Sequence, residues 1–278
     1  MSFKDLLVVV DDSSSAAERI DVAGRLASAF GAHLTGLHVT DSPALRPSVL
    51  AQFPSEVLDI LVNVGREEAD KARALFESRV HGWGAGVAVE WRAVEGDSGE
   101  VVALHARYAD LAVIGQTDPD DPGAPSDLPE RVIMGGGRPV LVVPYAGSFK
   151  TVGQKVIVAW NAGREATRAV NDALPVLERA ASVRVVSINP HGGPGGHGPV
   201  AGADISLHLA RHGVRVEAST IHAEDVRVDD LLLSQAADSG ADLIVMGAYG
   251  HSRLGEFVLG GATRHILRQI TVPVLMSH

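Results

Sequence analysis

The residues with the clearest chemical potential are glycines near the end of the sequence. An apolar run over residues 242–246 stops at Gly247, and Gly250 follows it. After nine further residues, the pair Gly260-Gly261 opens a segment with the apolar periodicity of a helix. Glycine lets the backbone approach a ligand closely, and the first N–H groups of a helix are unpaired donors at the positive end of its dipole. The spacing therefore predicts a loop that binds an anion, most often a phosphate.

Few cations accompany this loop. The last lysine in the sequence is Lys155, and the pattern G-x-x-x-x-G-K-[ST] is absent. A phosphate would have to rely on backbone N–H groups, hydroxyls, Arg253, Arg264 or His251. Phosphoryl transfer usually needs a fixed cation and Mg²⁺ to stabilise its transition state, so the loop favours binding over fast transfer. A tight strand-to-helix turn, with glycine needed only for backbone geometry, is the alternative.

The elements that must position this loop occur twice along the chain. Each copy begins with a short apolar strand, a polar turn and an amphipathic helix, and the second copy has Asn161 where the first has Asp11. A later strand with the pattern A-D-L-x-V-x-G and a final strand beginning P-V-L also recur. Such a repeat predicts two copies of one structural unit. The matching segments are 5–27 and 155–177, 109–115 and 241–247, and 138–144 and 272–277.

The alternation of strands and helices predicts the fold. Strands rich in Val, Ile and Leu between amphipathic helices indicate an open parallel sheet covered on both faces. We therefore predict an α/β fold with two doubly wound, five-stranded parallel-sheet domains, over residues 1–146 and 153–278. Additional strands are expected at 33–39, 87–95, 183–188 and 214–220, and helices at about 55–79, 98–108, 204–212 and 228–239.

The last strand of each half would leave an exposed sheet edge. Residues 140–143 and 274–276 are these two edges, and an unpaired edge invites aggregation. We therefore expect the two strands to pair within the molecule. This prediction leaves the formation of a homodimer open.

Composition narrows the class of protein. The 278 residues are 46% hydrophobic and 21% charged, they carry a formal net charge of −10, and they include no cysteine. Disulfides and thiolate metal sites are thereby excluded, and the acidic balance disfavours non-specific nucleic-acid binding. No apolar run is long enough to span a bilayer, and the first residues lack the pattern of a signal peptide. We expect a cytoplasmic protein without nucleic-acid or membrane partners.

Taken together, these residues resemble the universal stress protein family in its tandem form, over essentially the whole chain. The most specific part is the family's nucleotide signature, G-x-x-G-x9-G-[ST], which Gly247, Gly250 and Gly260 match. The resemblance implies an adenine nucleotide alpha hydrolase-like fold and a pseudo-dimer within one chain. It also implies ATP, with Mg²⁺, as the ligand, although members of the family divide into nucleotide binders and non-binders.

The resemblance assigns roles by position. The three signature glycines would line the ribose and triphosphate, Asn161 would meet the adenine, and backbone groups near Ile188 would hold the base. These places agree with the rule that ligands lie beyond the carboxyl ends of parallel strands. The predicted nucleotide-binding residues are Asn161, Ile188, Gly247, Gly250, His251, Arg253, Gly260, Gly261, Ala262 and Thr263.

Two departures from the family pattern bear on this site. Gly261 replaces the family's Ser or Thr, which removes a hydroxyl donor, and Thr263 is the nearest substitute. Asn161 replaces an aspartate, which removes a charge and keeps an acceptor. Together these changes predict weaker binding or an altered preference among nucleotides.

The first half departs further. Asp118 stands where the counterpart of Gly250 should be, and Asp120 and Asp121 follow it. Carboxylates repel a triphosphate, and their side chains occupy space that a close-approaching backbone needs. We predict that the first half does not bind ATP.

Three functions from different classes follow. The first is a regulatory protein whose second half binds ATP and presents ligand-dependent surfaces to unidentified protein partners. The second is a slow ATPase, which the missing lysine and the lack of an evident general base disfavour. The third is a scaffold that binds no nucleotide, and indifference of its thermal stability to millimolar ATP would favour that scaffold.

Other candidate sites have simpler readings. His208 and His212 share one face of a predicted helix at a spacing that zinc can use, but Gly213 follows, so interaction of His212 with the helix C-terminus is favoured. The glycine-rich segment 190–202 is read as a loop, which could cover a nucleotide. Asp11, with the serines after it, is read as a helix N-cap rather than as a catalytic residue.

Overall fold

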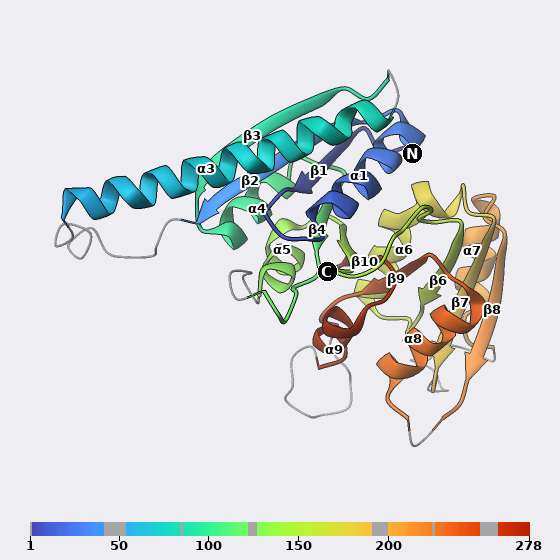
Figure 1. The fold of residues 1–278 in the computed structure, drawn as a ribbon. Coiled ribbons are helices and arrows are strands. Elements are labelled where there is room, and N and C mark those ends of the chain that lie inside the picture. The colour runs from blue at the N-terminus through green and yellow to red at the C-terminus, as the bar shows by residue number, and fades with distance from the viewer. Residues whose placement is uncertain are drawn as a thin grey trace. The chain divides into compact units, whose positions relative to one another are not determined.

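The computed structural model describes residues 2–41, 54–83, 86–121, 127–190, 200–223, 226–250 and 261–278. Its described chain forms two compact α/β units, Phe3–Gly136 and Gly137–His278 with Met1–Ser2. Figure 1 labels the elements of both units. None of the helices in the described chain combines the length and the apolar character needed to cross a membrane.

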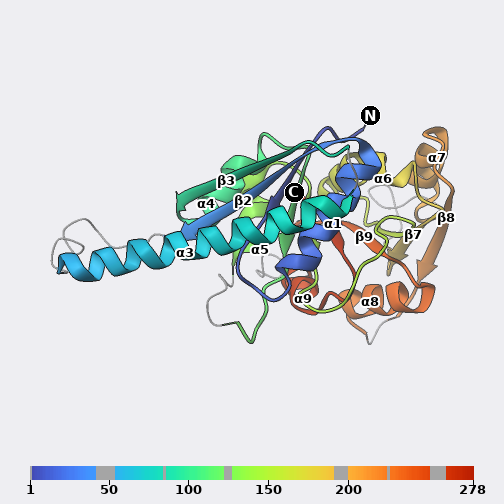
Figure 2. The same ribbon diagram turned by 45° about the horizontal axis from the view of Figure 1, so that its top comes forward.

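The first unit contains four parallel strands in the order β3-β2-β1-β4. Its helices pack as neighbouring pairs, α1 against α3 and α4 against α5, and Figure 2 shows α1 crossing the C-terminal part of α3. The elements are β1 (Asp5–Val9), α1 (Ala16–Phe30), β2 (His33–Asp41), α3 (Ser55–Val80), η1 (His81–Trp83), β3 (Val89–Gly96), α4 (Ser98–Ala106), β4 (Leu111–Gly115) and α5 (Leu128–Gly136).

The second unit contains six strands in the order β5-β10-β9-β6-β7-β8. All neighbouring pairs are parallel except β5 and β10, which are antiparallel. Its elements are β5 (Val140–Val143), β6 (Lys155–Ala159), α6 (Arg164–Leu177), β7 (Ser182–Ile188), α7 (Ala203–Arg211), β8 (Val216–Ile221), α8 (Val228–Ser239), β9 (Leu243–Gly247), α9 (Gly261–Gln269) and β10 (Val274–Ser277).

The predicted edge pairing is confirmed, with one consequence for the strand count. Val142 pairs with Val274 and Leu141 with Leu275, so β5 and β10 satisfy each other's backbone groups. Because of this pairing, β5 belongs to the second compact unit although it is the last strand of the first repeat in sequence. The mostly parallel α/β fold is as predicted, and each predicted domain supplies five of the described strands, β1–β5 and β6–β10, although β5 lies in the second compact unit.

The duplication is also visible in a matching polar contact at the start of each unit. Asp110 accepts hydrogen bonds from the backbone N–H groups of Lys4 and Asp5, at 2.7 and 3.1 Å. Asp242 occupies the equivalent place before β9 and accepts from the N–H groups of residues 153, 154 and 155, at 2.9–3.0 Å for its Oδ1 atom. In each unit, one carboxylate therefore accepts hydrogen bonds from several backbone N–H groups at the beginning of the first strand of the repeat.

Bulky aromatic side chains occupy glycine gaps in the first unit. A methyl group placed on Gly24 would lie 2.1 Å from the indole of Trp83, and one on Gly36 would lie 2.9 Å from Phe76. Phe76 also contacts Trp91, with ring centroids 5.6 Å apart. These contacts make the half-buried Trp83 and Trp91 packing residues against the core.

Candidate functional site

The candidate site lies at the carboxyl ends of β6, β7 and β9. The chain passes from β6 to β7 and β8 on one side, whereas β9 and β10 lie on the other side of β6. Strand order therefore reverses between β6 and β9, and in open parallel sheets ligands bind beyond the strand ends at such a point. Gly247 ends β9, Ile188 ends β7, and Asn161 follows β6 by two residues.

Gly247 brings the end of β9 directly against the first turn of α6. A methyl group on Gly247 would lie 2.4 Å from the backbone nitrogen of Ala166 and 2.5 Å from the carbonyl carbon of Glu165. No side chain fits there unless the helix moves. Glycine at this position is therefore required by packing, and that packing places a helix N-terminus beside the strand end.

Gly250 has a different neighbour. A methyl group there would lie 2.8 Å from Oε2 of Glu165, the far end of a flexible side chain, and its backbone φ lies outside the left-handed region. Neither backbone conformation nor a rigid neighbour requires glycine at 250. This distinguishes it from Gly247.

Three non-glycine residues with left-handed backbone lie just beyond these strand ends. Ala162 follows β6 with φ of 56°, Asn189 follows β7 with φ of 47°, and Tyr249 follows β9 with φ of 55°. Such conformations are uncommon for residues with a Cβ and cluster at functional sites. Their shared location agrees with a ligand site at the same edge of the sheet.

Side-chain hydrogen bonds hold two of the three turns. Asn161 is exposed, and its Oδ1 accepts from the N–H of Gly163 at 2.9 Å. The Asn189 side chain donates to the carbonyl of Ala223 and accepts from its N–H, at 2.8 and 2.9 Å. Ile188 pairs with Ile221 in the β7–β8 ladder, which fixes the backbone expected to meet the base.

The start of α9 is tied to the turn after β9. Thr263 is buried, and its Oγ1 accepts a hydrogen bond from the N–H of Tyr249 at 3.1 Å, which does not use the hydroxyl proton. Gly261 and Ala262 are the first two residues of α9 and are exposed, so their N–H groups belong to the helix start. The predicted residues His251, Arg253 and Gly260 lie outside the described residues.

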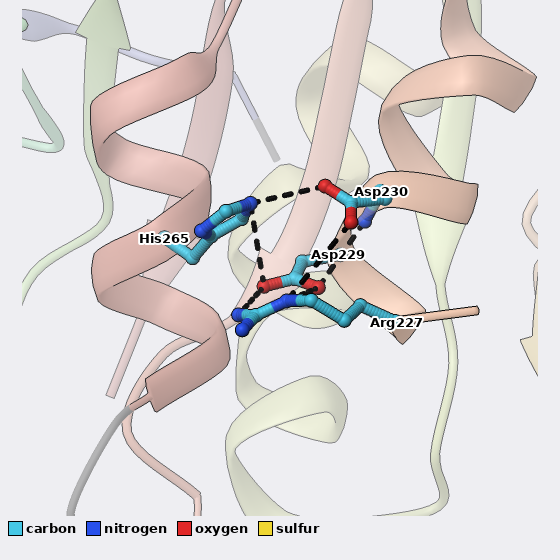
Figure 3. Close-up of polar contacts among 4 residues, drawn as sticks. All are labelled: Arg227, Asp229, Asp230 and His265. Atoms are coloured by element: carbon cyan, nitrogen blue, oxygen red, sulfur yellow. Dashed lines mark hydrogen bonds and ion pairs between the residues drawn. The ribbon is translucent and has the colours of Figure 1, made fainter. Parts of the chain in front are cut away.

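A second polar cluster joins α8 to α9, as Figure 3 shows. Arg227 donates to both carboxylate oxygens of Asp229, at 3.0 and 2.5 Å, and Nε2 of His265 lies 3.0 Å from Asp230. Asp229 is only 2% exposed. Burial alone would raise the pKa of Asp229, but the hydrogen bonds from Arg227 and the nearby His265 lower it below its ordinary value.

This cluster is the only group of three metal-ligating side chains that the described part of the chain brings together. The Arg227 guanidinium already provides Asp229 with a cation, so the arrangement reads as an ion-pair link between two helices. Sequence reasoning missed this link. The one signal was a histidine within the apolar periodicity of α9, and its acidic partners lie 35 residues away along the chain.

The histidine pair of α7 lies at the C-terminal end of the helix, where His212 was expected to interact with the helix terminus. The rings of His208 and His212 are 4.7 Å apart. His212 is the C-cap residue, and Gly213 adopts left-handed backbone with φ of 80°. Residues 191–199 of the glycine-rich segment, read as a loop that could cover a nucleotide, are outside the described residues.

The equivalent crevice of the first unit holds a buried arginine. Arg19 is 2% exposed, donates to the carbonyl of Val9 at 2.8 Å, and pairs with Asp11 at 2.7 Å. A methyl group on Gly115, the counterpart of Gly247, would lie 2.0 Å from the Arg19 guanidinium. The guanidinium therefore fills the space beside this strand end.

Asp11 supports the arginine instead of capping α1. Burial raises the pKa of Asp11, but Arg19 and the hydrogen bonds from Ser13 outweigh burial and hold it below its usual value. Ser15 occupies the N-cap position of α1 and makes no capping hydrogen bond with its side chain. The expected N-cap role of this aspartate and its serines is thus replaced by an ion pair.

Comparison with known proteins identifies the family. The sequence profile described as "Universal stress protein family" matches residues 2–144 and 153–278. The chain belongs to this family. Its two matched regions correspond to the two sequence repeats.

Individual relatives agree with a tandem universal stress protein. The chain is 26% identical to Universal stress protein Slr1230 of Synechocystis sp. over 292 aligned positions, covering 98% of this chain and 99% of that protein. A universal stress protein structure from Archaeoglobus fulgidus matches with a TM-score of 0.72 at 16% identity, covering 98% of this chain and 95% of the other. A protein of unknown function from Pseudomonas aeruginosa, PA1789, matches with a TM-score of 0.56 at 17% identity, covering 99% and 92%.

Proposed function

We propose that this universal stress protein acts in the cytoplasm and that its second unit binds ATP, with Mg²⁺, as a regulatory ligand in a stress response. The observation that carries the proposal is the juxtaposition of Gly247 with the first turn of α6, at the sheet's switch point. Unpaired N–H groups of α6 and α9 can there face a phosphate, which backbone donors and helix dipoles bind without a lysine.

The nucleotide fits the remaining residues at this edge. Gly250, Gly261 and Ala262 would meet the phosphates through backbone groups, Asn161 would meet the adenine, and the backbone at Ile188 would hold the base. Binding would alter the protein's surfaces only through a difference in ATP affinity between two conformations. Protein partners would bind one of the two conformations in preference to the other.

A pair of glycine variants separates this proposal from a purely structural turn. Gly250→Leu should keep the fold, because the described atoms that its Cβ would approach belong to the movable side chain of Glu165. It should weaken ATP binding by about tenfold or more, because the backbone can no longer approach the phosphates closely. Gly247→Ala should lower the free energy of unfolding by about 1–3 kcal/mol, because its methyl group meets the backbone of α6.

Calorimetric titration of Mg-ATP into nucleotide-stripped protein measures the first effect, and one site per chain is expected. Asp118→Leu is the matched control, since Asp118 is the first-unit counterpart of Gly250, and it should leave the ATP affinity unchanged. Wild-type affinity in Gly250→Leu would disprove the site. Absence of ATP binding by the wild type at millimolar concentration would favour the scaffold function instead.

A further inference from the structure

We infer that Glu165 makes the nucleotide site of the second unit depend on a divalent cation bound with the nucleotide. Glu165 is the second residue of α6. Its Oε2 atom lies 2.8 Å from a methyl group placed on Gly250 and 3.4 Å from one placed on Gly163. The carboxylate therefore stands between the turn after β6 and the turn after β9, where the phosphates are proposed to bind.

No cation neutralises this carboxylate within the described residues. None of them donates a hydrogen bond to the Glu165 side chain or forms an ion pair with it, in contrast to the paired carboxylates of Asp229 and Asp11. It lies in the first turn of α6, at the positive end of the helix dipole. The Glu165 carboxylate thus lies beside Gly250 and Gly163 without a counter-ion among the described side chains.

The carboxylate changes which form of the nucleotide can enter. The triphosphate of metal-free ATP is strongly anionic, and like charges at contact distance repel each other. A divalent cation on the phosphates cancels part of their charge, and Mg²⁺ is held in proteins by one or two carboxylates together with substrate phosphates. Glu165 would then repel metal-free ATP and tolerate or attract its Mg²⁺ complex.

This feature belongs to the second unit alone. The β1–β4 and β6–β9 registers, Val8 with Val113 and Val158 with Val245, align Asn161 with Asp11 and Glu165 with Ser15. Where the second unit has a carboxylate, the first unit has a neutral hydroxyl. The acidic group is therefore a specific property of the unit that is proposed to bind nucleotide, and the inference rests on that proposed function.

The test compares ATP dissociation constants in excess Mg²⁺ and in excess EDTA for the full chain. In the wild type, we expect metal-free ATP to bind at least about tenfold more weakly than Mg-ATP. Glu165→Gln should tighten the binding of metal-free ATP and remove most of this difference. The control is Glu178→Gln, which makes the same change in net charge at the C-terminal end of α6 and should preserve the wild-type ratio.

The outcomes separate the inference from the proposed function. If ATP binds in one site and Glu165→Gln keeps the wild-type dependence on Mg²⁺, the role of Glu165 is disproved while ATP binding stands. If all variants bind ATP equally in Mg²⁺ and in EDTA, the inference also fails. If no variant binds ATP in either condition, both the inference and the proposed function are overturned.

Discussion

The same strand-to-helix crevice occurs in both units, and different side chains occupy it. In the first unit, the Arg19 guanidinium lies against Gly115 and pairs with Asp11. In the second unit, the position equivalent to Arg19 is Ala169, which is fully buried, and the glycine at the strand end lies against the backbone of α6 and the Cβ of Glu165. The first crevice is thus filled from within the unit.

The comparison shows that a signature glycine alone does not specify a ligand. Gly115 and Gly247 both end the fourth strand of a repeat, and neither has room for a side chain. The residues facing them decide the chemistry, because one unit supplies a buried cation and the other supplies helix N–H groups with a carboxylate. This difference supports the prediction that the first unit does not bind ATP.

Removing the arginine should give the largest effect on stability. Arg19→Ala leaves a cavity and a partly buried Asp11 without its partner, so the free energy of unfolding of the first unit should fall by about 2–4 kcal/mol. Differential scanning calorimetry follows the transition of that unit. Arg25→Ala, which breaks a more solvent-accessible ion pair on the same helix, should cost less than about 1 kcal/mol.

The arginine variant also tests the comparison itself. If Arg19 only fills space, Arg19→Ala should still not bind ATP in the first unit, because Asp118 and its acidic neighbours remain. A second ATP site per chain in that variant would show that the arginine alone closes the crevice.

The stability that Asp110 and Asp242 each contribute should increase with the number of backbone N–H groups that the carboxylate accepts from. Asp242→Ala leaves the N–H groups of residues 153, 154 and 155 without an acceptor and should lower the free energy of unfolding by about 2 kcal/mol. Asp110→Ala leaves two N–H groups without an acceptor and should lower it by about 1 kcal/mol. Thermal unfolding of each variant measures this. Asp242→Asn keeps an acceptor oxygen and should lose less than Asp242→Ala, and equal losses would contradict the hydrogen-bond account.

The smallest expected effect is the pH dependence of the Asp11–Arg19 pair. The pKa of Asp11 is lower in the folded protein than its ordinary value of 3.8, so its stabilising effect is complete above that value. The effect is lost as pH falls through the lower folded pKa. Since the side chain is 42% exposed and water screens the pair, we expect less than about 1 kcal/mol.

Asp11→Asn tests this sign by urea unfolding across pH. The variant should be less stable than the wild type at neutral pH, and the difference should shrink in acid. At the equivalent site of the second unit, Asn161→Asp introduces a carboxylate that has no counterpart of Arg19, because Ala169 stands there. Asn161→Asp should be no more stable than the wild type at neutral pH. A gain in stability as large as the loss in Asp11→Asn would remove the contrast between the units.

The sequence by itself determined the repeated α/β plan. Runs of Val, Ile and Leu become buried parallel strands because both faces of the sheet are covered, and amphipathic segments become the helices that cover them. The glycine spacing also predicted that a strand ends at Gly247 and that a helix opens at Gly260-Gly261, and β9 ends at Gly247 while α9 begins at Gly261. The ends of several elements shifted by one or two residues, because chain ends depend on hydrogen bonds made by their neighbours.

Only the tertiary structure decided which side chains meet. It placed Arg19 against the strand end at Gly115 and Glu165 beside Gly250, and it joined His265 to Asp230. These contacts link residues that are distant in sequence, and the direction of each side chain depends on how helices pack on the sheet. Local propensity and periodicity fix the elements, whereas charge and shape at the strand ends arise only when those elements pack together.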